Sequence, residues 1–249
     1  MKAKPRSYVI CSTPRTGSTL LCGLLSSTGV AGRPESYFRR QDDIGWAARW
    51  GICGPDGNFD LADYFQAATE AGKSPNGVFA ARVMWGTLDE MLADLRRLYP
   101  EEAGDDLAVL TAAFGPMRFV YLRRDDLVAQ AVSRVRAEET EVWFETDDSQ
   151  PVGPVARPRF DAERISRYVR EAEEHNAAWQ AWFHSVGTEP HKVVYEDLDA
   201  DPVATTLRVL DYLDIRLPPS AVVTPKHRRL ADALSAEWAA RYEASTRRV

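Results

Sequence analysis

The sequence predicts an α/β fold in which helices cover a central, mainly parallel sheet. Two observations predict it: short runs of β-branched and aromatic residues alternate with longer segments, and the apolar residues of those longer segments recur at helical spacing. This alternation is typical of the strand–helix units that build parallel sheets. No repeat or change in composition divides the 249 residues, and this length suffices for one compact core. We therefore expect a single domain over residues 1–249.

The order of the elements follows from the same pattern. The predicted strands are residues 7–12, 77–85, 117–124 and 191–198. The predicted helices are residues 17–29, 87–99, 125–140, 161–185, 201–215 and 229–244. Two stretches, 29–60 and 144–160, show no regular spacing. The second is too polar and too rich in proline for a core, so we expect a lid or a surface loop there.

Composition and charge exclude several classes of protein. The net charge of −6 argues against a general nucleic-acid binder. No apolar stretch approaches the roughly 18–20 residues of a membrane span, and the basic N-terminus lacks the apolar core of a signal peptide. The cysteines are odd in number and lack CxxC spacing, which favours reduced thiols over a disulfide framework or a zinc site. We expect a cytoplasmic protein without nucleic acid or metal.

The stretch CSTPRTGST, residues 11–19, predicts an anion site. It lies between the first strand and the first helix. The backbone N–H groups of such a turn and the positive end of the helix dipole bind phosphate or sulfate. Arg15 adds forked donors, and Ser18 and Thr19 add hydroxyl groups. An ordinary strand–helix turn capped by a hydroxyl is the alternative.

Three familiar phosphate loops do not fit this stretch. A Walker A loop requires G-x-x-x-x-G-K-[ST], whereas Ser18 follows Gly17 here and the first glycine is missing. A dinucleotide-binding fingerprint requires three spaced glycines, and only Gly17 is available. A cysteine phosphatase would place its arginine farther from Cys11. A loop for a different phosphate or sulfate ester remains.

The residues resemble a known family. STPRTGSTLL resembles the 5′-phosphosulfate loop of sulfotransferases that use 3′-phosphoadenylyl sulfate (PAPS). The ordered set RTGSTLL, TGVAGRPESYF, NGVFAARVMW, LRRDDLVAQAVSRVRA and SAEWAARY resembles the bacterial trehalose 2-sulfotransferase family, from residue 15 to residue 242. The resemblance implies a three-layer, P-loop-like domain that uses PAPS without a metal. It also implies a homodimer.

A second anchor for the nucleotide follows from topology. The carboxyl ends of parallel strands share one edge of the sheet, so Arg15 and Arg124 should lie close together. In sulfotransferases an arginine and a serine in this relation hold the 3′-phosphate of PAPS, and the resemblance assigns Arg124 and Ser133. Arg123 is the alternative register, and an ordinary surface arginine is the alternative role. The full predicted nucleotide set is Arg15, Thr16, Gly17, Ser18, Thr19, Arg124 and Ser133.

The resemblance also indicates a catalytic base. In the family, a GxPxE-type pattern after the first helix ends on the base, but GRPESYF places Ser36 there and Glu35 one residue earlier. The predicted catalytic residues are Glu35, as the base, and Arg15, whose charge faces the transferred group. A solvated loop glutamate is the alternative for Glu35. The four histidines lie outside these motifs and are interpreted as surface or helix-packing residues: His175, His184, His191 and His227.

The acceptor site is predicted from aromatic residues beside charged donors, a combination that suits a sugar or another hydroxylated ring compound. Each tryptophan also suits a core. The family's trehalose-contacting glutamine is replaced by Pro14, and its base column holds Ser36, so the acceptor remains open. The predicted acceptor residues are Arg33, Tyr37, Phe38, Trp46, Trp50 and Trp85.

The sequence therefore predicts a sulfotransferase that moves the sulfuryl group of PAPS to a hydroxyl of a small-molecule acceptor, with a carbohydrate or glycoside as the candidate. One alternative is a metal-free, nucleotide-dependent phosphotransferase relative. Another is a non-catalytic module that binds PAPS or its product, 3′-phosphoadenosine 5′-phosphate (PAP). Ser36 in the base column is the feature that favours the second alternative.

Overall fold

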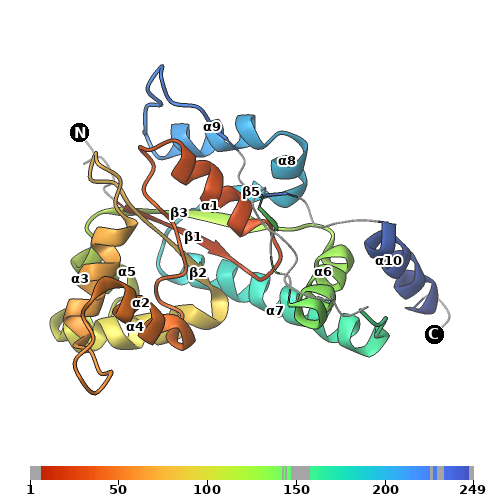
Figure 1. The fold of residues 1–249 in the computed structure, drawn as a ribbon, viewed down its shortest axis with the longest axis horizontal. Helices are drawn as coiled ribbons and strands as arrows, with labels where there is room; N and C mark the ends of the chain where they lie inside the picture. Colours follow the sequence, from red (N-terminus) through yellow and green to blue (C-terminus); the bar gives the residue numbers. More distant parts are fainter. Residues whose placement is uncertain are drawn as a thin grey trace.

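Within the part of the chain that the structure describes, a four-stranded parallel sheet lies at the centre (Figure 1). The computed structural model describes residues 7–141, 143, 145–146, 158–224, 227–228 and 233–246. The strand order is β2-β1-β3-β5, and each neighbouring pair is parallel. The bounds are Ser7–Ser12 for β1, Phe79–Met84 for β2, Met117–Arg123 for β3 and His191–Val194 for β5. The predicted α/β class with a parallel central sheet is confirmed.

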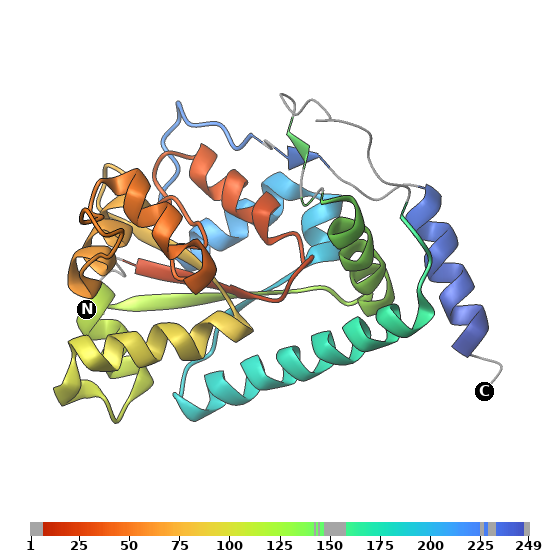
Figure 2. The ribbon, with the colours of Figure 1, turned by 60° about the horizontal axis from the view of Figure 1, so that its bottom comes forward.

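Helices cover both faces of the sheet and make three layers (Figure 2). Successive residues of β1 point to opposite faces, as a strand requires: Val9 and Cys11 join one core cluster, and Tyr8 and Ile10 join the other. The first cluster's face is covered by α3 (Leu61–Gly72), α4 (Trp85–Leu98), α5 (Asp106–Phe114) and α7 (Ala162–Ser185). The other is covered by α1 (Ser18–Ser27), α8 (Tyr195–Ala200) and α9 (Pro202–Tyr212). None of the described helices is long and apolar enough to cross a membrane.

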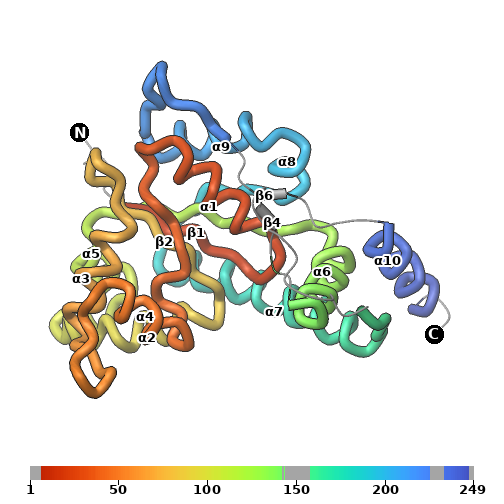
Figure 3. Tube along the Cα trace, viewed as in Figure 1, coloured from red at the N-terminus to blue at the C-terminus, as the bar shows by residue number. Residues whose placement is uncertain are grey.

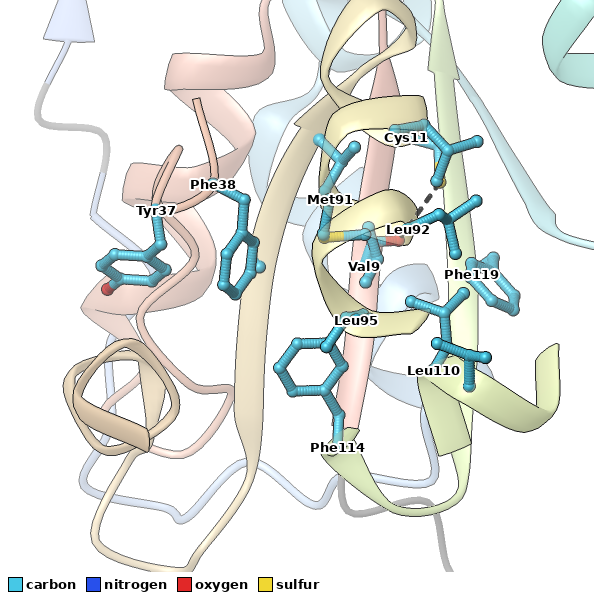
Figure 4. Close-up of a cluster of buried hydrophobic side chains, with 14 of the residues drawn as sticks. Val9, Cys11, Tyr37, Phe38, Met91, Leu92, Leu95, Leu110, Phe114 and Phe119 are labelled. Atoms are coloured by element: carbon cyan, nitrogen blue, oxygen red, sulfur yellow. Dashed lines mark hydrogen bonds between the residues drawn. The ribbon is translucent and has the colours of Figure 1, made fainter. Parts of the chain in front are cut away.

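The larger core cluster lies between the sheet and α4 (Figure 4). Met91, Leu92 and Leu95 share one face of α4 because they are spaced by one, three and four residues. They lie against Val9 of β1 and Phe119 of β3, and all five side chains are buried. Burial of each such side chain stabilises the fold by about 1.5–3 kcal/mol. This packing holds β1 firmly at the point from which the predicted anion loop leaves the sheet.

A smaller core joins the helices beyond the sheet (Figure 3). It consists of α6 (Leu127–Thr140), the first half of α7 and α10 (Ala233–Thr246). Val132 and Val135 of α6 pack against Ile165 and Tyr168 of α7 and Trp238 of α10. Helix α6 is therefore held by α7 and α10, while its first turns lie beside the loop that follows β1.

The prediction of a strand at 191–198 is wrong in its second half. β5 ends at Val194, and α8 begins at Tyr195. Glu196 and Asp197 lie in the first turn of α8, where carboxylates are stabilised by the helix dipole. Glu196 also accepts hydrogen bonds from the backbone N–H groups of Asp125 and Asp126, 3.1 Å each, so this turn is held against the end of β3.

The stretch 29–60, predicted to be irregular, contains a helix. A 3-10 turn at Arg40–Asp42 leads into α2 (Asp43–Trp50). Trp46 and Trp50 lie four residues apart on one side of α2 and pack on the larger core. With eight residues, α2 offers too few repeats for its period to stand out. Helices α3 and α5 also lie where no element was predicted.

The lid or surface loop predicted at 144–160 lies largely outside the described residues. The structure describes Glu145–Thr146 (β4) and residues 158–160 of this stretch. β4 pairs with His227–Arg228 (β6) in an antiparallel ladder. This small pairing brings the segment after α6 beside the segment before α10.

The turn from β1 into α1 requires glycine at position 17. Gly17 has a φ of +80°, a left-handed conformation that residues with a β-carbon rarely adopt. A β-carbon at this position would also lie 2.6 Å from Cδ2 of Tyr195. The Tyr195 ring thus packs directly on the backbone of the turn.

Gly17→Ala is expected to lower the free energy of unfolding by about 1–3 kcal/mol, because of the left-handed backbone and the clash with Tyr195. Gly45→Ala is the matched control, since Gly45 lies in α2 and a β-carbon there meets nothing within 4 Å. That variant should be neutral or stabilised by up to about 1 kcal/mol. Urea unfolding measures both, and an unchanged stability of Gly17→Ala would contradict the packing described.

Candidate active site

The candidate site lies at the carboxyl edge of the sheet, where loops leave parallel strands. The end of β1 is fixed there by the fully buried Trp179 of α7, whose Nε1 donates to the Ser12 carbonyl oxygen at 3.1 Å. The next residues form a turn in which Thr16 Oγ1 donates to the Thr13 carbonyl oxygen at 2.9 Å. Both threonines are buried, so the turn has a rigid base.

The backbone N–H groups of this turn have no hydrogen-bond acceptor in the described part of the chain. Among the described residues, none accepts a hydrogen bond from the backbone N–H groups of residues 15–19. Helix α1 begins after Gly17 without a side-chain cap. Uncapped N–H groups at the start of a ten-residue helix, together with its dipole, form a site for phosphate or sulfate.

Arg15 turns its side chain toward α6. Its Nε donates to Oγ of Ser133 at 3.0 Å, and its Nη1 donates to the carbonyl oxygen of Trp143. Its backbone has a φ of +69°, a left-handed conformation that is costly for a residue with a β-carbon. Burial lowers the pKa of the Arg15 guanidinium from its ordinary value, and the nearby charge of Arg124 lowers this pKa further.

Arg124 lies beside Arg15 and is nearly buried. Its guanidinium carbon lies 4.4 Å from the centre of the Tyr195 ring, and its side chain is 10% exposed. Its Nε is 3.8 Å from Oε1 of Glu196, too far for a hydrogen bond, and this buried donor has no hydrogen-bond partner among the described residues. The alternative, Arg123, forms an exposed ion pair with Asp125 at 3.0 Å. The geometry therefore favours Arg124 as the anion ligand.

Arg82 is a site residue that the sequence prediction missed. It lies in β2, and its Nη1 donates to Oγ1 of Thr19 at 2.8 Å while its Nε donates to Oγ of Ser36 at 2.9 Å. Its backbone N–H donates to the Glu35 carbonyl oxygen at 2.9 Å. The signal available in the sequence was an arginine inside the otherwise apolar strand FAARVM. Arg82 joins the start of α1 to the segment of the predicted base.

Glu35 is exposed at the edge of this arrangement. Among the described residues its carboxylate makes no hydrogen bond or ion pair. Glu35 also lies close enough to α1 to act on Cys22. Burial raises the pKa of the Cys22 thiol to about 12; the negative charge of Glu35 adds to this rise, and the positive charge of Arg82 opposes it. Glu35 and Arg82 are neighbours, because the Arg82 backbone N–H donates to the Glu35 carbonyl oxygen.

The predicted acceptor residues are divided by the structure. Tyr37 and Phe38 are 3% and 5% exposed and belong to the larger core, where they pack against other aromatic rings (Figure 4). Trp46 and Trp50 stack on each other at 5.4 Å on the rim of that core. Tyr37 and Phe38 therefore serve packing, whereas Trp46 and Trp50 are only half-buried and their predicted acceptor role stays a prediction.

Two of the predicted acceptor residues lie elsewhere. Trp85 is half-buried at the start of α4, directly after β2, with its ring 5.1 Å from that of Trp179 in an edge-to-face contact. This places Trp85 at the carboxyl edge of the sheet. Arg33 is exposed three residues before Ser36, and its carbonyl oxygen accepts a hydrogen bond from the Tyr37 hydroxyl at 2.7 Å.

The described histidines differ in their distance from this edge, and His175 lines a small cavity beside Thr13 and Pro14 of the loop. His184 is exposed near the end of α7, and His175 is half-buried on the same helix. His191 stacks on Tyr212 at 4.9 Å, and burial lowers the pKa of its imidazole. The backbone of His227 is part of β6. Among the described residues, no group of three or more His, Cys, Asp or Glu is arranged to hold a metal ion.

Comparison with known proteins agrees with this geometry. The family model of the Stf0 sulphotransferases matches residues 7–245. Two trehalose 2-sulfotransferases, from Mycobacterium tuberculosis and Mycolicibacterium smegmatis, are each 30% identical to the chain, with 100% of the chain and 98% of the relative covered. The crystal structure of a sulfotransferase from Alicyclobacillus acidocaldarius shares the fold, with a TM-score of 0.51, 14% identity, and coverage of 98% of this chain and 96% of that one. The chain therefore belongs to the Stf0 sulphotransferase family and is a sulfotransferase.

Proposed function

We propose that the protein transfers the sulfuryl group of PAPS to a hydroxyl of a small-molecule acceptor, with a carbohydrate or glycoside as the candidate. The observation that carries this proposal is the convergence of Arg15, Arg124 and Ser133 on the uncapped start of α1, where the backbone N–H groups of residues 15–19 are open. This arrangement offers two anion sites side by side, as a nucleotide with phosphates on both ends of its ribose requires.

The residues present fit the nucleotide. The buried Nε of Arg124 has no hydrogen-bond partner among the described residues. Oγ of Ser133 accepts from Arg15 Nε and keeps its own proton to donate. Forked guanidinium donors suit phosphate geometry, so Arg124 and Ser133 would hold the 3′-phosphate. The turn and its Thr16, Gly17, Ser18 and Thr19 would hold the 5′-phosphosulfate, with Gly17 leaving room for a close approach.

Two arginines support the transfer step. PAPS supplies an activated sulfuryl group, and charge develops on its oxygens as it moves to the acceptor. Arg15 lies on one side of the loop and Arg82 on the other, where its Nη1 contacts the Thr19 hydroxyl. Fixed positive charge in a partly buried site stabilises developing negative charge without rearrangement. We propose Arg15 as a catalytic residue and Arg82 as a second charge at the same group.

Glu35 is the proposed base. It is a neighbour of Arg82, and its carboxylate has no partner among the described residues, so it is available to accept the proton of an acceptor hydroxyl. The hydroxyl oxygen of Ser36 accepts a hydrogen bond from Arg82. Among the described residues, no side chain is placed to take the proton of the Ser36 hydroxyl. Of the predicted acceptor residues, Arg33 is exposed and Trp46, Trp50 and Trp85 are half-buried, so these four remain accessible to a ligand.

The acceptor class is supported by the relatives, which are named trehalose 2-sulfotransferases. Pro14 and Ser36 replace two residues of the trehalose pattern, so we propose a hydroxylated ring compound without specifying trehalose. The single domain over residues 1–249, the homodimer and the cytoplasmic location stay predictions. They rest on the sequence and on the resemblance to the family.

The nucleotide proposal predicts a difference between PAP and ADP. PAP should raise the melting temperature without a metal, because binding to the folded state adds about 2.7 kcal/mol at a hundredfold excess over Kd. ADP lacks the 3′-phosphate and should produce a much smaller shift. Differential scanning fluorimetry with and without Mg²⁺ measures both. Equal shifts would favour the phosphotransferase alternative, and a shift that requires Mg²⁺ would contradict metal-free binding of the nucleotide.

Substitution of Arg124 and substitution of Arg15 should have different effects on the enzyme kinetics. Arg124→Ala is expected to weaken PAPS binding by about 1.5–3 kcal/mol, the value of a lost charged hydrogen bond, with little effect on kcat. Arg15→Ala should also lower kcat, because its charge faces the oxygens that gain charge. Arg123→Ala is the matched control and should behave like the wild type, since that ion pair is exposed. A change in KM alone in Arg15→Ala would make Arg15 a binding residue only.

Removal of the proposed base should slow turnover and spare binding. Glu35→Gln keeps the shape but not the proton acceptor, so single-turnover transfer should fall about 10²–10⁴-fold while PAP affinity stays unchanged. Adding Ser36→Glu to this variant tests whether a carboxylate in the family's column restores transfer. Near-normal transfer by Glu35→Gln would assign the base to another residue. PAPS that binds but is never consumed across an acceptor panel would favour the non-catalytic alternative.

A further inference from the structure

Gln130 connects α6 to the anion loop from inside the protein. The residue is 3% exposed and lies one turn before Ser133. Its Nε2 donates to Oγ1 of Thr13 at 2.9 Å and to the carbonyl oxygen of Pro14 at 2.7 Å. Both acceptors belong to the turn that precedes α1, and Pro14 directly precedes the strained Arg15.

The orientation of this amide is fixed by Pro14. A backbone carbonyl oxygen only accepts, so the NH₂ end of Gln130 must face it. The consequence is that Oε1 is buried without a hydrogen-bond partner among the described residues. An apolar side chain of similar size would remove this orphaned oxygen but would leave the Thr13 hydroxyl and the Pro14 carbonyl oxygen without their donor. The contribution of the glutamine therefore lies in its two bonds to the loop.

The bond to Pro14 also sets the direction of the next N–H group. The peptide between Pro14 and Arg15 is trans and planar, so its C=O and N–H point in opposite directions. With the carbonyl oxygen held toward α6, the N–H of Arg15 points away from α6. This N–H is one of the open donors of the turn. The same bond restrains Arg15 in its left-handed conformation, which the residue would otherwise leave.

We propose that Gln130 is a positioning residue that aims the Arg15 N–H at the 5′ end of the bound nucleotide by holding the Pro14 carbonyl. The inference rests on the proposed function. It makes a specific claim about which part of the nucleotide is affected. The 3′-phosphate would be held chiefly by Arg124, which contacts Tyr195 and Glu196 and not the Pro14 peptide. Loss of Gln130 should therefore weaken recognition of the 5′-phosphate much more than recognition of the 3′-phosphate.

The test compares two nucleotides on a graded set of variants by isothermal titration calorimetry. Gln130→Met keeps the volume and removes both donors, so the Kd of PAP should rise about tenfold or more, as for the loss of a buried hydrogen bond. The Kd of adenosine 3′-monophosphate, which has no 5′-phosphate, should stay within about twofold of wild type because Arg124 and Ser133 are unchanged. Thr13→Val removes one of the two acceptors and should give a smaller loss for PAP.

Two further variants control for fold effects. Gln130→Glu keeps the shape but places a carboxylate against the Pro14 carbonyl oxygen, and it should weaken PAP more than Gln130→Met does. Gln66→Met, on the exposed face of α3, should leave both nucleotides unaffected. Melting temperatures without ligand report stability separately, and Gln130→Met should stay folded with a change of a few degrees at most.

The outcomes distinguish this inference from the proposed function. An equal loss of affinity for both nucleotides in Gln130→Met would make Gln130 a general structural residue and overturn the inference. Unchanged affinity for PAP would overturn it as well. Failure of the wild-type protein to bind PAP would instead contradict the proposed function. A selective loss for PAP, largest in Gln130→Glu and smallest in Thr13→Val, would support the positioning role.

Discussion

One constraint governs this structure: the turn after β1 must keep several backbone N–H groups unpaired while both of its ends are anchored in the core. Trp179 holds the last residue of β1 from one face, and Tyr195 covers Gly17 from the other. An unpaired donor costs about 1–3 kcal/mol when water is excluded. The two packed faces of the sheet supply the stability that allows such a turn to persist, and the proposed anion would satisfy its donors.

Charge at the site is arranged to remain available. The charge of Arg124 lowers the pKa of the Arg15 guanidinium. Arg15 donates to the hydroxyl of Ser133, and the carboxylate of Glu196 stays 3.8 Å from Arg124 Nε, beyond hydrogen-bonding distance. Arg82 likewise contacts the hydroxyls of Thr19 and Ser36. A carboxylate partner would neutralise these guanidinium groups, whereas a hydroxyl orients them and leaves the charge for a ligand. The Tyr195 ring offsets part of the burial of Arg124 through its π face.

The features that could be predicted from the sequence are those that local residue patterns and sheet topology determine. The strand–helix alternation indicated the parallel sheet, and its shared edge explains why Arg15 and Arg124 meet. Arg82 was missed because no spacing rule connects β2 to the start of α1; only the register between β1 and β2 does. Tyr37 and Phe38 were expected at a ligand, but rings beside charged residues look the same in sequence whether they face solvent or core. The strand predicted at 191–198 is wrong after Val194. The prediction gave more weight to the β-branched and aromatic residues of this segment than to the acidic residues that begin α8.

The joint at Arg82 has a consequence for which positions of the chain can be substituted. The chain between α1 and β2 leaves and re-enters the sheet as one continuous insertion, and it carries Glu35, Ser36 and α2 while contributing no strand to the sheet. Its neck is narrow: a β-carbon at Gly32 would lie 2.7 Å from Ala80 Cβ, and one at Gly72 would lie 2.5 Å from the Phe79 ring. Both ends of the insertion are fixed against β2, and its Tyr37, Phe38, Tyr64 and Phe65 are buried in the larger core. Replacement of the whole insertion would therefore remove part of that core, whereas substitution of its exposed residues would leave the core intact.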